Sequence, residues 1–204
     1  MRRYFFAFGL VMAASSWPPS MAAPDVANFI GALGNQTLEV IRSNRTLSEK
    51  LAYFHRVLKE DFDLPGISRF VLGPYWQAAS EAQRQEFQSL LEDYLVRFYG
   101  QRLAGYNAET LKVTGSRAEP AAAFVTSQLI QPQGSPIQIV WRLDVRGDRY
   151  KISDVAINGI SMALSQRSMF ANLIQRRGGQ LAGLLEAMRA GETEGGDSDL
   201  TSSP

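Results

Sequence analysis

The spacing of the apolar residues changes twice along this chain, and this change restricts the possible folds more than any other feature. Residues 25–104 carry apolar side chains at the spacing of amphipathic helices, and residues 111–157 alternate apolar with polar side chains as half-buried strands do. From residue 161 the helical spacing returns. The pattern predicts an α+β fold: a curved four-stranded antiparallel sheet with N-terminal helices packed on one face and C-terminal helices, enclosing an apolar pocket.

Local signals mark the ends of these elements. The patterns T-x-x-E at 46–49 and S-x-x-Q at 80–83 are capping boxes, which predict two helix starts. We expect the second of these helices to be the longest, over 80–104. The segments QPQGSP (131–136) and RGDR (146–149) contain the glycine and proline residues of hairpin connections. These short connections predict that neighbouring strands are antiparallel.

The composition narrows the class of protein. A chain of 204 residues with 45% hydrophobic residues fits one globular domain with a sizeable core. The formal net charge of +1 and the absence of a basic run argue against a nucleic-acid partner. The chain has no cysteine and a single histidine, which excludes disulfides, thiolate metal sites and a histidine-rich metal site. We therefore expect no cofactor and no metal.

The N-terminal residues have the pattern of a secretory signal peptide, which we place at 1–22. Two arginines at 2–3 precede an apolar stretch over 4–14, and small residues follow. Cleavage is expected after Ala22 or after Ala23. The apolar stretch is shorter than the roughly 20 residues that span a bilayer, so an uncleaved anchor is the weaker alternative. The sequence therefore predicts an exported protein.

The other end of the chain differs in composition from the body. The segment 191–204, GETEGGDSDLTSSP, contains four acidic residues, no basic residue and almost nothing apolar. Such a segment cannot bury enough apolar surface to fold, so we predict a disordered acidic tail. The folded domain is expected over residues 24–190.

One short stretch suggests chemistry. Residues 159–163, GISMA, differ by one residue from the G-x-S-x-G turn on which some hydrolases mount a nucleophilic serine. That turn belongs to a parallel sheet with a histidine after the serine, whereas the only histidine here, His55, comes about a hundred residues earlier. We therefore expect Gly159 to form a tight turn and Ser161 to cap a helix. An esterase that uses Ser161 stays open as an alternative.

Several motifs together resemble a known family, the MlaC-type or toluene-tolerance proteins, over about residues 25–190. The motifs stand in the family's order and spacing: VLGPYW (71–76), QRQEF (83–87), Asp154-Val155, the G-x-S at 159–161 and the R-S-x-F at 167–170. The segments FDLP (62–65) and GPYW (73–76) are most similar to the subgroup associated with hopanoid biosynthesis. The combination is specific even though each motif alone is weak.

This resemblance implies a non-enzymatic function. It implies a soluble periplasmic carrier, auxiliary to ABC transport, that holds the acyl tails of a phospholipid and maintains outer-membrane lipid asymmetry. The resemblance implies a phospholipid or hopanoid-type ligand. It also implies exchange with two partners, an inner-membrane MCE-domain ABC transporter and an outer-membrane lipoprotein complex. A scaffold domain whose core is completely filled is the remaining alternative.

The predicted lipid-binding residues follow from strand alternation, from the apolar helix stripes and from the turn before the last helices. Arg167 is expected near the mouth of the pocket, where it would meet a lipid phosphate, although a structural ion pair is the alternative. The full predicted set is Val71, Leu72, Tyr75, Trp76, Phe87, Leu91, Tyr94, Phe98, Ile139, Trp141, Leu143, Ile160, Met162, Arg167 and Phe170.

Overall fold

The computed structural model describes residues 26–104, 109–146 and 149–193. The order of elements confirms the predicted α+β class. The elements are α1 (Val26–Arg42), α2 (Leu47–Asp61), α3 (Leu64–Leu72), α4 (Pro74–Ala78), α5 (Glu81–Leu95), the π-helical turn η1 (Val96–Gly100), α6 (Gln101–Ala104), β1 (Thr110–Ala118), β2 (Ala122–Ile130), β3 (Ile137–Arg146), β4 (Arg149–Ile157), β5 (Ile160–Ser161), α7 (Met162–Arg176) and α8 (Leu181–Arg189).

The described strands form one antiparallel sheet in the order β1-β2-β3-β4-β5. The four long strands are those predicted, and β5 is an addition of two residues. It forms because Asn158 and Gly159 adopt positive φ values of 47° and 85° and fold the chain back, so that Ile160 pairs with Ile157. Of the predicted hairpin connections, 131–136 contains Gly134 at φ 87°. Part of the other lies outside the described residues.

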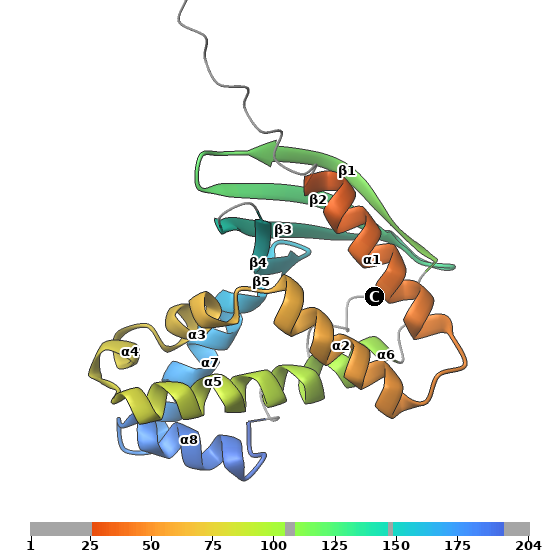
Figure 1. Cartoon of the computed structure of the whole chain (residues 1–204). Coiled ribbons are helices and arrows are strands. Elements are labelled where there is room, and N and C mark those ends of the chain that lie inside the picture. Colours follow the sequence, from red (N-terminus) through yellow and green to blue (C-terminus); the bar gives the residue numbers. More distant parts are fainter. Residues whose placement is uncertain (1–25, 105–108, 147–148, 194–204) are drawn as a thin grey trace, which may run out of the picture.

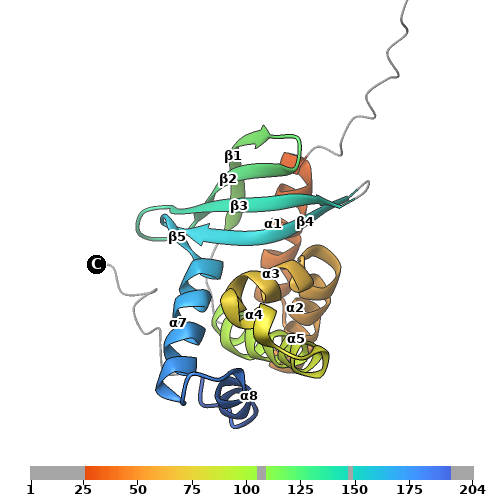
Figure 2. The ribbon, with the colours of Figure 1, turned by 90° about the vertical axis from the view of Figure 1, so that its left-hand side faces the viewer.

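The sheet forms one layer, and the helices α2 to α5 and α7 form a helical layer on one face of it, with α8 on the side of α5 away from the sheet (Figures 1 and 2). Helix α1 lies against β1 and is held there by Asn35. The Asn35 side chain donates to the carbonyl of Leu111 at 3.1 Å and accepts from the amide of Leu111 at 3.0 Å. A neighbouring strand would make the same two kinds of bond, so Asn35 satisfies the backbone of β1 at this point.

Apolar burial is divided between two main cores. One lies among the helices, where Phe87, Tyr94 and Phe170 are almost completely buried. The other lies between α1 and the sheet, around Ile30 and Leu143. A third, small cluster joins α1 to α2. The sheet with α1 and the remaining helices therefore each have a core of their own.

The side chain of Phe62 connects these cores, because it packs against all three clusters. Phe62 caps the C-terminal end of α2 and forms an isolated parallel bridge with Ile152 of β4. The next residue, Asp63, donates its amide to the carbonyl of Ile152 at 2.9 Å. The link between α2 and α3 therefore attaches the helical layer to the sheet.

The predicted helix starts are confirmed, and one predicted helix is interrupted. The capping boxes at Thr46 and Ser80 are both complete, with side chain and backbone bonded in each direction. The helix expected over 80–104 consists of α5, η1 and α6. The π-helical turn adds one residue to the local repeat and so rotates the residues after it relative to those of α5. Tyr99 belongs to this turn and lines the cavity described below, together with Leu91 and Leu95 of α5.

The two ends of the chain are described only in part. The predicted signal peptide, 1–22, lies outside the described residues. Of the predicted disordered tail, the structure describes residues 191–193, where Glu192 forms an ion pair with Arg177 and Thr193 is buried. Residues 194–204 lie outside the described residues, so their disorder stays a prediction. No helix in the described ranges is long and apolar enough to cross a membrane.

Candidate functional site

A cavity of about 250 Å³ lies between the sheet and the helical layer, and its wall is almost entirely apolar. It receives side chains from both main cores and from the small third cluster. The lining residues are Leu33, Gly34, Thr37, Leu38, Ile41, Phe54, Val57, Leu58, Phe62, Ile67, Val71, Leu91, Leu95, Tyr99, Leu111, Leu129, Ile139, Trp141, Ser153, Asp154, Val155, Ile157, Met162, Ala163 and Gln166.

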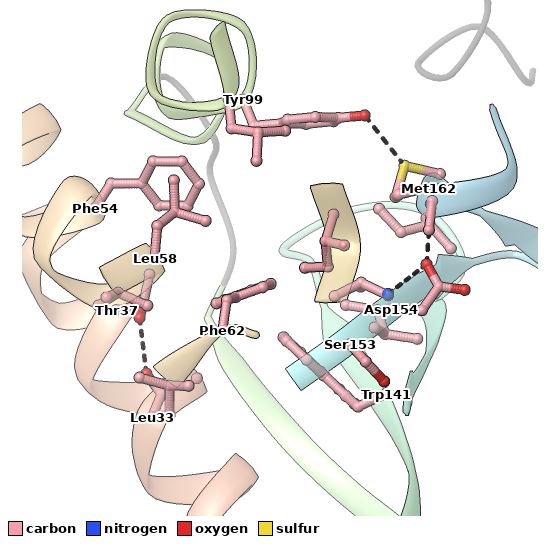
Figure 3. Close-up of a pocket in the computed structure, with 18 of the residues that line it drawn as sticks. Leu33, Thr37, Phe54, Leu58, Phe62, Tyr99, Trp141, Ser153, Asp154 and Met162 are labelled. Carbon is pink, nitrogen blue, oxygen red and sulfur yellow. Dashed lines mark hydrogen bonds between the residues drawn. The ribbon is translucent and has the colours of Figure 1, made fainter. Parts of the chain in front are cut away.

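Different elements supply the different walls of this cavity (Figure 3). Leu33 and Thr37 of α1 lie on one side, with Phe54 and Leu58 of α2 next to them. Across the cavity lie side chains of β3, β4 and the start of α7. Tyr99 closes a further side and points its hydroxyl toward Met162, and Phe62 projects between the walls (Figure 3).

The indole of Trp141 is held in the wall by a buried serine. Its Nε1 donates to the Ser127 hydroxyl oxygen at 2.9 Å, and Ser127 is fully buried. Trp141 and Ser127 lie on adjacent strands, β3 and β2. A buried indole N–H without a partner would be costly, so this bond allows a large ring to face an apolar space.

Within the described ranges, Asp154 is the only charged residue that lines the cavity. Its carboxylate accepts from the Ser161 hydroxyl at 2.5 Å, from the amide of Ala163 at 3.0 Å and from the amide of Val155 at 2.8 Å. The charge therefore lies at the N-terminal end of α7, where the helix dipole stabilises an anion. Three donors satisfy this carboxylate without a ligand.

The predicted structural role of Ser161 agrees with its contacts. Ser161 is the N-cap of α7, because its hydroxyl oxygen accepts from the amide of Leu164 at 3.1 Å. The only histidine of the chain, His55, is bonded instead to Glu92 of α5. The serine, the acid and the histidine of a hydrolytic triad are therefore not assembled around Ser161.

Two polar residues from different helices meet in the cavity wall. Gln166 of α7 is only 5% exposed, and its Nε2 donates to the Tyr99 hydroxyl oxygen at 2.8 Å. The Tyr99 hydroxyl in turn lies 3.7 Å from the sulfur of Met162. The Oε1 of Gln166 is buried and has no hydrogen-bond partner in the described part of the chain.

Five of the predicted lipid-binding residues line this cavity. They come from α3, α5, β3 and the start of α7. These residues are Val71, Leu91, Ile139, Trp141 and Met162. The structure therefore brings together part of the predicted set, and the binding of lipid by these residues stays a prediction.

The other predicted residues lie elsewhere. Six are in the helical core: Leu72, Trp76, Phe87, Tyr94, Phe98 and Phe170; Tyr75 packs against that core, Leu143 is in the sheet core, and Ile160 is exposed on the surface. The aromatic side chains of α5 contact α7 rather than the sheet. Phe87 meets Phe170 edge to face at 5.7 Å, and Tyr94 meets Phe170 at 5.8 Å.

Arg167 also lies outside the cavity lining. Its guanidinium donates to the carbonyl of Phe70 at 3.2 Å and lies over the Phe70 ring, 5.2 Å from its centroid. It therefore joins α7 to α3. The predicted alternative of a structural role fits these contacts, although the partner is a carbonyl and a ring rather than an acid.

Sequence reasoning missed the contribution of α1 and α2. Helix α1 supplies a stripe of five residues at helical spacing, namely Leu33, Gly34, Thr37, Leu38 and Ile41. Helix α2 supplies Phe54, Val57 and Leu58. The apolar periodicity of both helices was visible in the sequence. An apolar helix face can be buried against the sheet or against other helices, however, and the sequence does not indicate which helix borders the space between the two layers.

Comparison with known proteins agrees with this architecture. The model of the family described as MlaC protein matches residues 32–190. This chain belongs to the MlaC family. The toluene tolerance protein ttg2D of Pseudomonas putida is 26% identical over 177 residues, which cover 86% of this chain and 81% of the relative. The hopanoid-associated subgroup stays a prediction.

A solved structure has the same fold as this MlaC-family chain. It is the phospholipid-binding protein from Ralstonia solanacearum in complex with a phospholipid, with a TM-score of 0.69 and 20% identity. The match covers 83% of this chain and 95% of the other chain. The similarity confirms the predicted architecture of helices packed on an open, curved antiparallel sheet.

Proposed function

We propose that this protein is a periplasmic lipid carrier without enzymatic activity, which holds the acyl tails of a phospholipid in the cavity between its two layers. The observation that carries the proposal is a space lined by apolar side chains from two separate cores. Membership of the MlaC family supports it. A structure of the same fold that is described as a complex with a phospholipid also supports it.

The physical reason for such a carrier is the cost of exposing hydrocarbon to water. Each methylene group transferred out of water contributes about 0.8 kcal/mol, so two acyl chains do not leave a membrane unshielded at an appreciable rate. An apolar cavity replaces the lipid environment. The described residues that line the cavity include no lysine, arginine or histidine. The tails are therefore its ligand, and the charged headgroup stays outside.

The cavity must enlarge when a diacyl lipid enters. Sites for drug-sized ligands have volumes of roughly 300–1,000 Å³, and the cavity here has about 250 Å³. Each layer has its own core, so the layers can separate without exposing either core completely. Phe62, which packs against both main cores, is the residue whose contacts must change. The proposal therefore includes movement of the sheet and α1 relative to the other helices.

Exchange of the lipid completes the proposed function. The partners are an inner-membrane MCE-domain ABC transporter and an outer-membrane lipoprotein complex, as the family resemblance implies. A hopanoid-type lipid is the alternative ligand. Localisation in the periplasm follows from the predicted signal peptide and from the family. Identification of the copurified lipid tests the ligand. Binding to each purified complex tests the two partners.

Native mass spectrometry of the purified protein tests the proposal directly. Wild type is expected to carry phospholipid, and Trp141→Glu and Leu91→Arg are expected to lose it because both place a charge in the cavity wall. Two surface variants on the same layers, Val145→Glu on β3 and Leu164→Arg on α7, are the matched controls. Circular dichroism and thermal unfolding establish that each variant is folded.

The outcomes separate the carrier from its alternatives. Lipid in wild type and in both surface controls, with none in the folded cavity variants, supports the carrier. Unchanged lipid in both cavity variants removes this cavity as the site. Wild type that never carries lipid, even after incubation with phospholipid vesicles, supports the scaffold alternative. Hydrolysis of ester substrates that is lost in Ser161→Ala, with the fold retained, supports the esterase.

A further inference from the structure

The polar pair in the cavity wall is not explained by tail binding alone. Gln166 lines the cavity, is 5% exposed and leaves its Oε1 without a partner in the described part of the chain. A buried amide oxygen without a hydrogen bond carries a free-energy cost, because it has lost its bond to water. A leucine or methionine would remove this cost and would suit an apolar wall better. The position therefore carries a polar group whose free end needs a partner that the described chain does not supply.

The neighbour of Gln166 lies in an irregular part of the backbone. Tyr99 belongs to the π-helical turn η1, which interrupts the helix expected from the sequence. Its hydroxyl accepts from the Nε2 of Gln166 at 2.8 Å, and its ring lines the same cavity. Single π-helical turns are uncommon and occur frequently at functional sites. Two independent features, the unsatisfied amide and the π-helical turn, thus coincide at one place.

We propose that Gln166 and Tyr99 form a polar subsite that hydrogen-bonds an oxygen-bearing group of the bound lipid, at the junction between its tails and its headgroup. This inference rests on the proposed function. The amide presents an acceptor or, when turned over, two donors at its free end. It therefore suits either a glycerol ester carbonyl or a free lipid hydroxyl. These two sources share the same chemistry and are distinguished by the test.

The subsite also sets the direction of the lipid. Tyr99 and Met162 lie across the cavity from Leu33 and Thr37 of α1 (Figure 3). The wall formed by α1 and β1 is apolar apart from Thr37, whose hydroxyl donates to the carbonyl of Leu33 at 2.7 Å. The acyl tails consequently extend toward α1 and β1. The ester or hydroxyl group stops at Gln166, which limits how deeply the lipid enters.

The chain supplies a matched control on the same helix. Gln175 of α7 donates its Nε2 to the Tyr75 hydroxyl, but neither residue lines the cavity. The variants Gln166→Met and Tyr99→Phe remove the polar pair of the cavity with little change in volume. Gln175→Met and Tyr75→Phe remove the equivalent pair outside it. A difference between the two sets therefore reports on the cavity and not on the loss of a glutamine–tyrosine bond in general.

The experiment compares three phosphatidylcholines of equal chain length in competition on the purified protein, read by native mass spectrometry. One has two ester-linked chains, one has two ether-linked chains, and one has two ether-linked chains that each carry a free hydroxyl on the second carbon, so that all three have the same amount of hydrocarbon. Wild type is expected to prefer the diester or the hydroxyl lipid over the diether by about 2- to 10-fold, the value of one hydrogen bond. The preferred lipid identifies the source.

Gln166→Met is expected to bind the three lipids in nearly equal amounts, with ratios close to one. Gln175→Met is expected to keep the wild-type preference. Tyr99→Phe is expected to weaken the preference, because Gln166 loses the partner that orients its amide. Equal binding of the three lipids by wild type overturns the subsite and leaves the carrier intact. A preference that survives in Gln166→Met overturns it as well. Wild type that binds none of the lipids overturns the carrier and the subsite together.

Discussion

The indole Nε1 of Trp141 donates a hydrogen bond to the hydroxyl of Ser127, 2.9 Å away on the neighbouring strand. Ser127 is fully buried between apolar neighbours in the sheet core, where a serine has no advantage in packing. Its hydroxyl also lies 3.5 Å from the carbonyl of Ile139. The serine therefore fixes the orientation of the largest ring in the cavity wall. The shape of the site depends on a residue that does not line it.

Replacement of Ser127 by alanine tests this dependence. Ser127→Ala leaves the Trp141 N–H without a partner, and we expect the free energy of unfolding to fall by about 1–3 kcal/mol. We also expect weaker lipid binding, because the ring is no longer held in one orientation. Urea unfolding and lipid titration measure the two effects. Thr126→Ala, at the next position of β2, is the control, and an equal loss of lipid binding there would contradict the assigned role.

The packing of α1 on β1 provides a prediction with an internal control. A Cβ atom at Gly34 would lie 2.3 Å from a methyl group of Leu111 and 3.2 Å from its Cβ, whereas a Cβ at Gly31 would meet Val113 at an ordinary 3.5 Å. Gly34→Ala is expected to push α1 away from β1. Gly31→Ala is expected to stabilise the protein by up to about 1 kcal/mol, because alanine favours the helix.

Both glycine variants are measured by thermal unfolding and by lipid binding. Gly34→Ala is expected to lower the stability, despite the better helix propensity, and to change the amount of bound lipid, since Gly34 and Leu111 both line the cavity. Gly31→Ala is expected to leave lipid binding unchanged. Equal stabilisation by the two alanines would show that α1 is not in close contact with β1 at Gly34.

The capping role of Ser161 predicts a loss of stability without a loss of chemistry. Ser161→Ala removes the bond to the amide of Leu164 and one of the bonds to Asp154. We expect the free energy of unfolding to fall by about 1 kcal/mol, as for other N-cap serines. Chemical denaturation measures it, and Ser165→Ala, inside the same helix, is the control. No change in stability would refute the cap.

The same two variants also test for esterase activity, with an activated ester as substrate. Wild type, Ser161→Ala and Ser165→Ala are expected to hydrolyse it at the same background rate, because the histidine of the chain is bonded to Glu92 and not to Ser161. A rate that exceeds background in wild type and disappears only in Ser161→Ala is the opposite result. It would revive the esterase alternative.

Asp61, at the end of α2, predicts a dependence of stability on pH. Burial raises the pKa of its carboxyl above the ordinary value, Lys151 opposes this by attraction, and Glu60 adds to it by repulsion. The folded protein therefore holds a proton on Asp61 at pH values where the unfolded chain has lost it. Stability falls as the pH rises from the unfolded pKa through the folded pKa, and the penalty persists above it.

Asp61→Asn removes this ionisation. The variant is expected to be more stable than wild type at neutral pH, and the difference is expected to shrink as the pH falls below the raised pKa. Urea unfolding at a series of pH values measures the difference, with Asp93→Asn as a control for the removal of an exposed carboxylate. A difference that grows toward acidic pH has the opposite sign and would show that Asp61 is stabilised as an anion.

Leu91 and Phe87 show how far the sequence could predict the site. They lie one helical turn apart on α5, both belong to its apolar stripe, and both are almost completely buried. Periodicity predicted their burial correctly, since it depends only on the 3.6-residue repeat. Leu91 faces the cavity, whereas Phe87 contacts Phe170. Helix α5 is buried on more than one side, and periodicity does not distinguish these sides.

Tyr99 and Gln166 show what could not be predicted at all. They are separated by 67 positions, and they meet because the assembled fold brings η1 and α7 together. The residues around Tyr99 continue the helical pattern without a glycine or proline before it. A one-residue change in helical repeat leaves no mark on such a pattern. The polar part of the cavity consequently appears only when the helices are assembled.

Local interactions were decided by the sequence itself. The capping boxes at Thr46 and Ser80, the strand alternation and the turn at Gly159 each involve residues within a few positions of one another, so their physical chemistry can be read along the chain. The tertiary structure alone decided which buried faces meet each other and which border an unfilled space. That outcome depends on how two separately packed layers approach, with Phe62 between them, and no short segment contains this information.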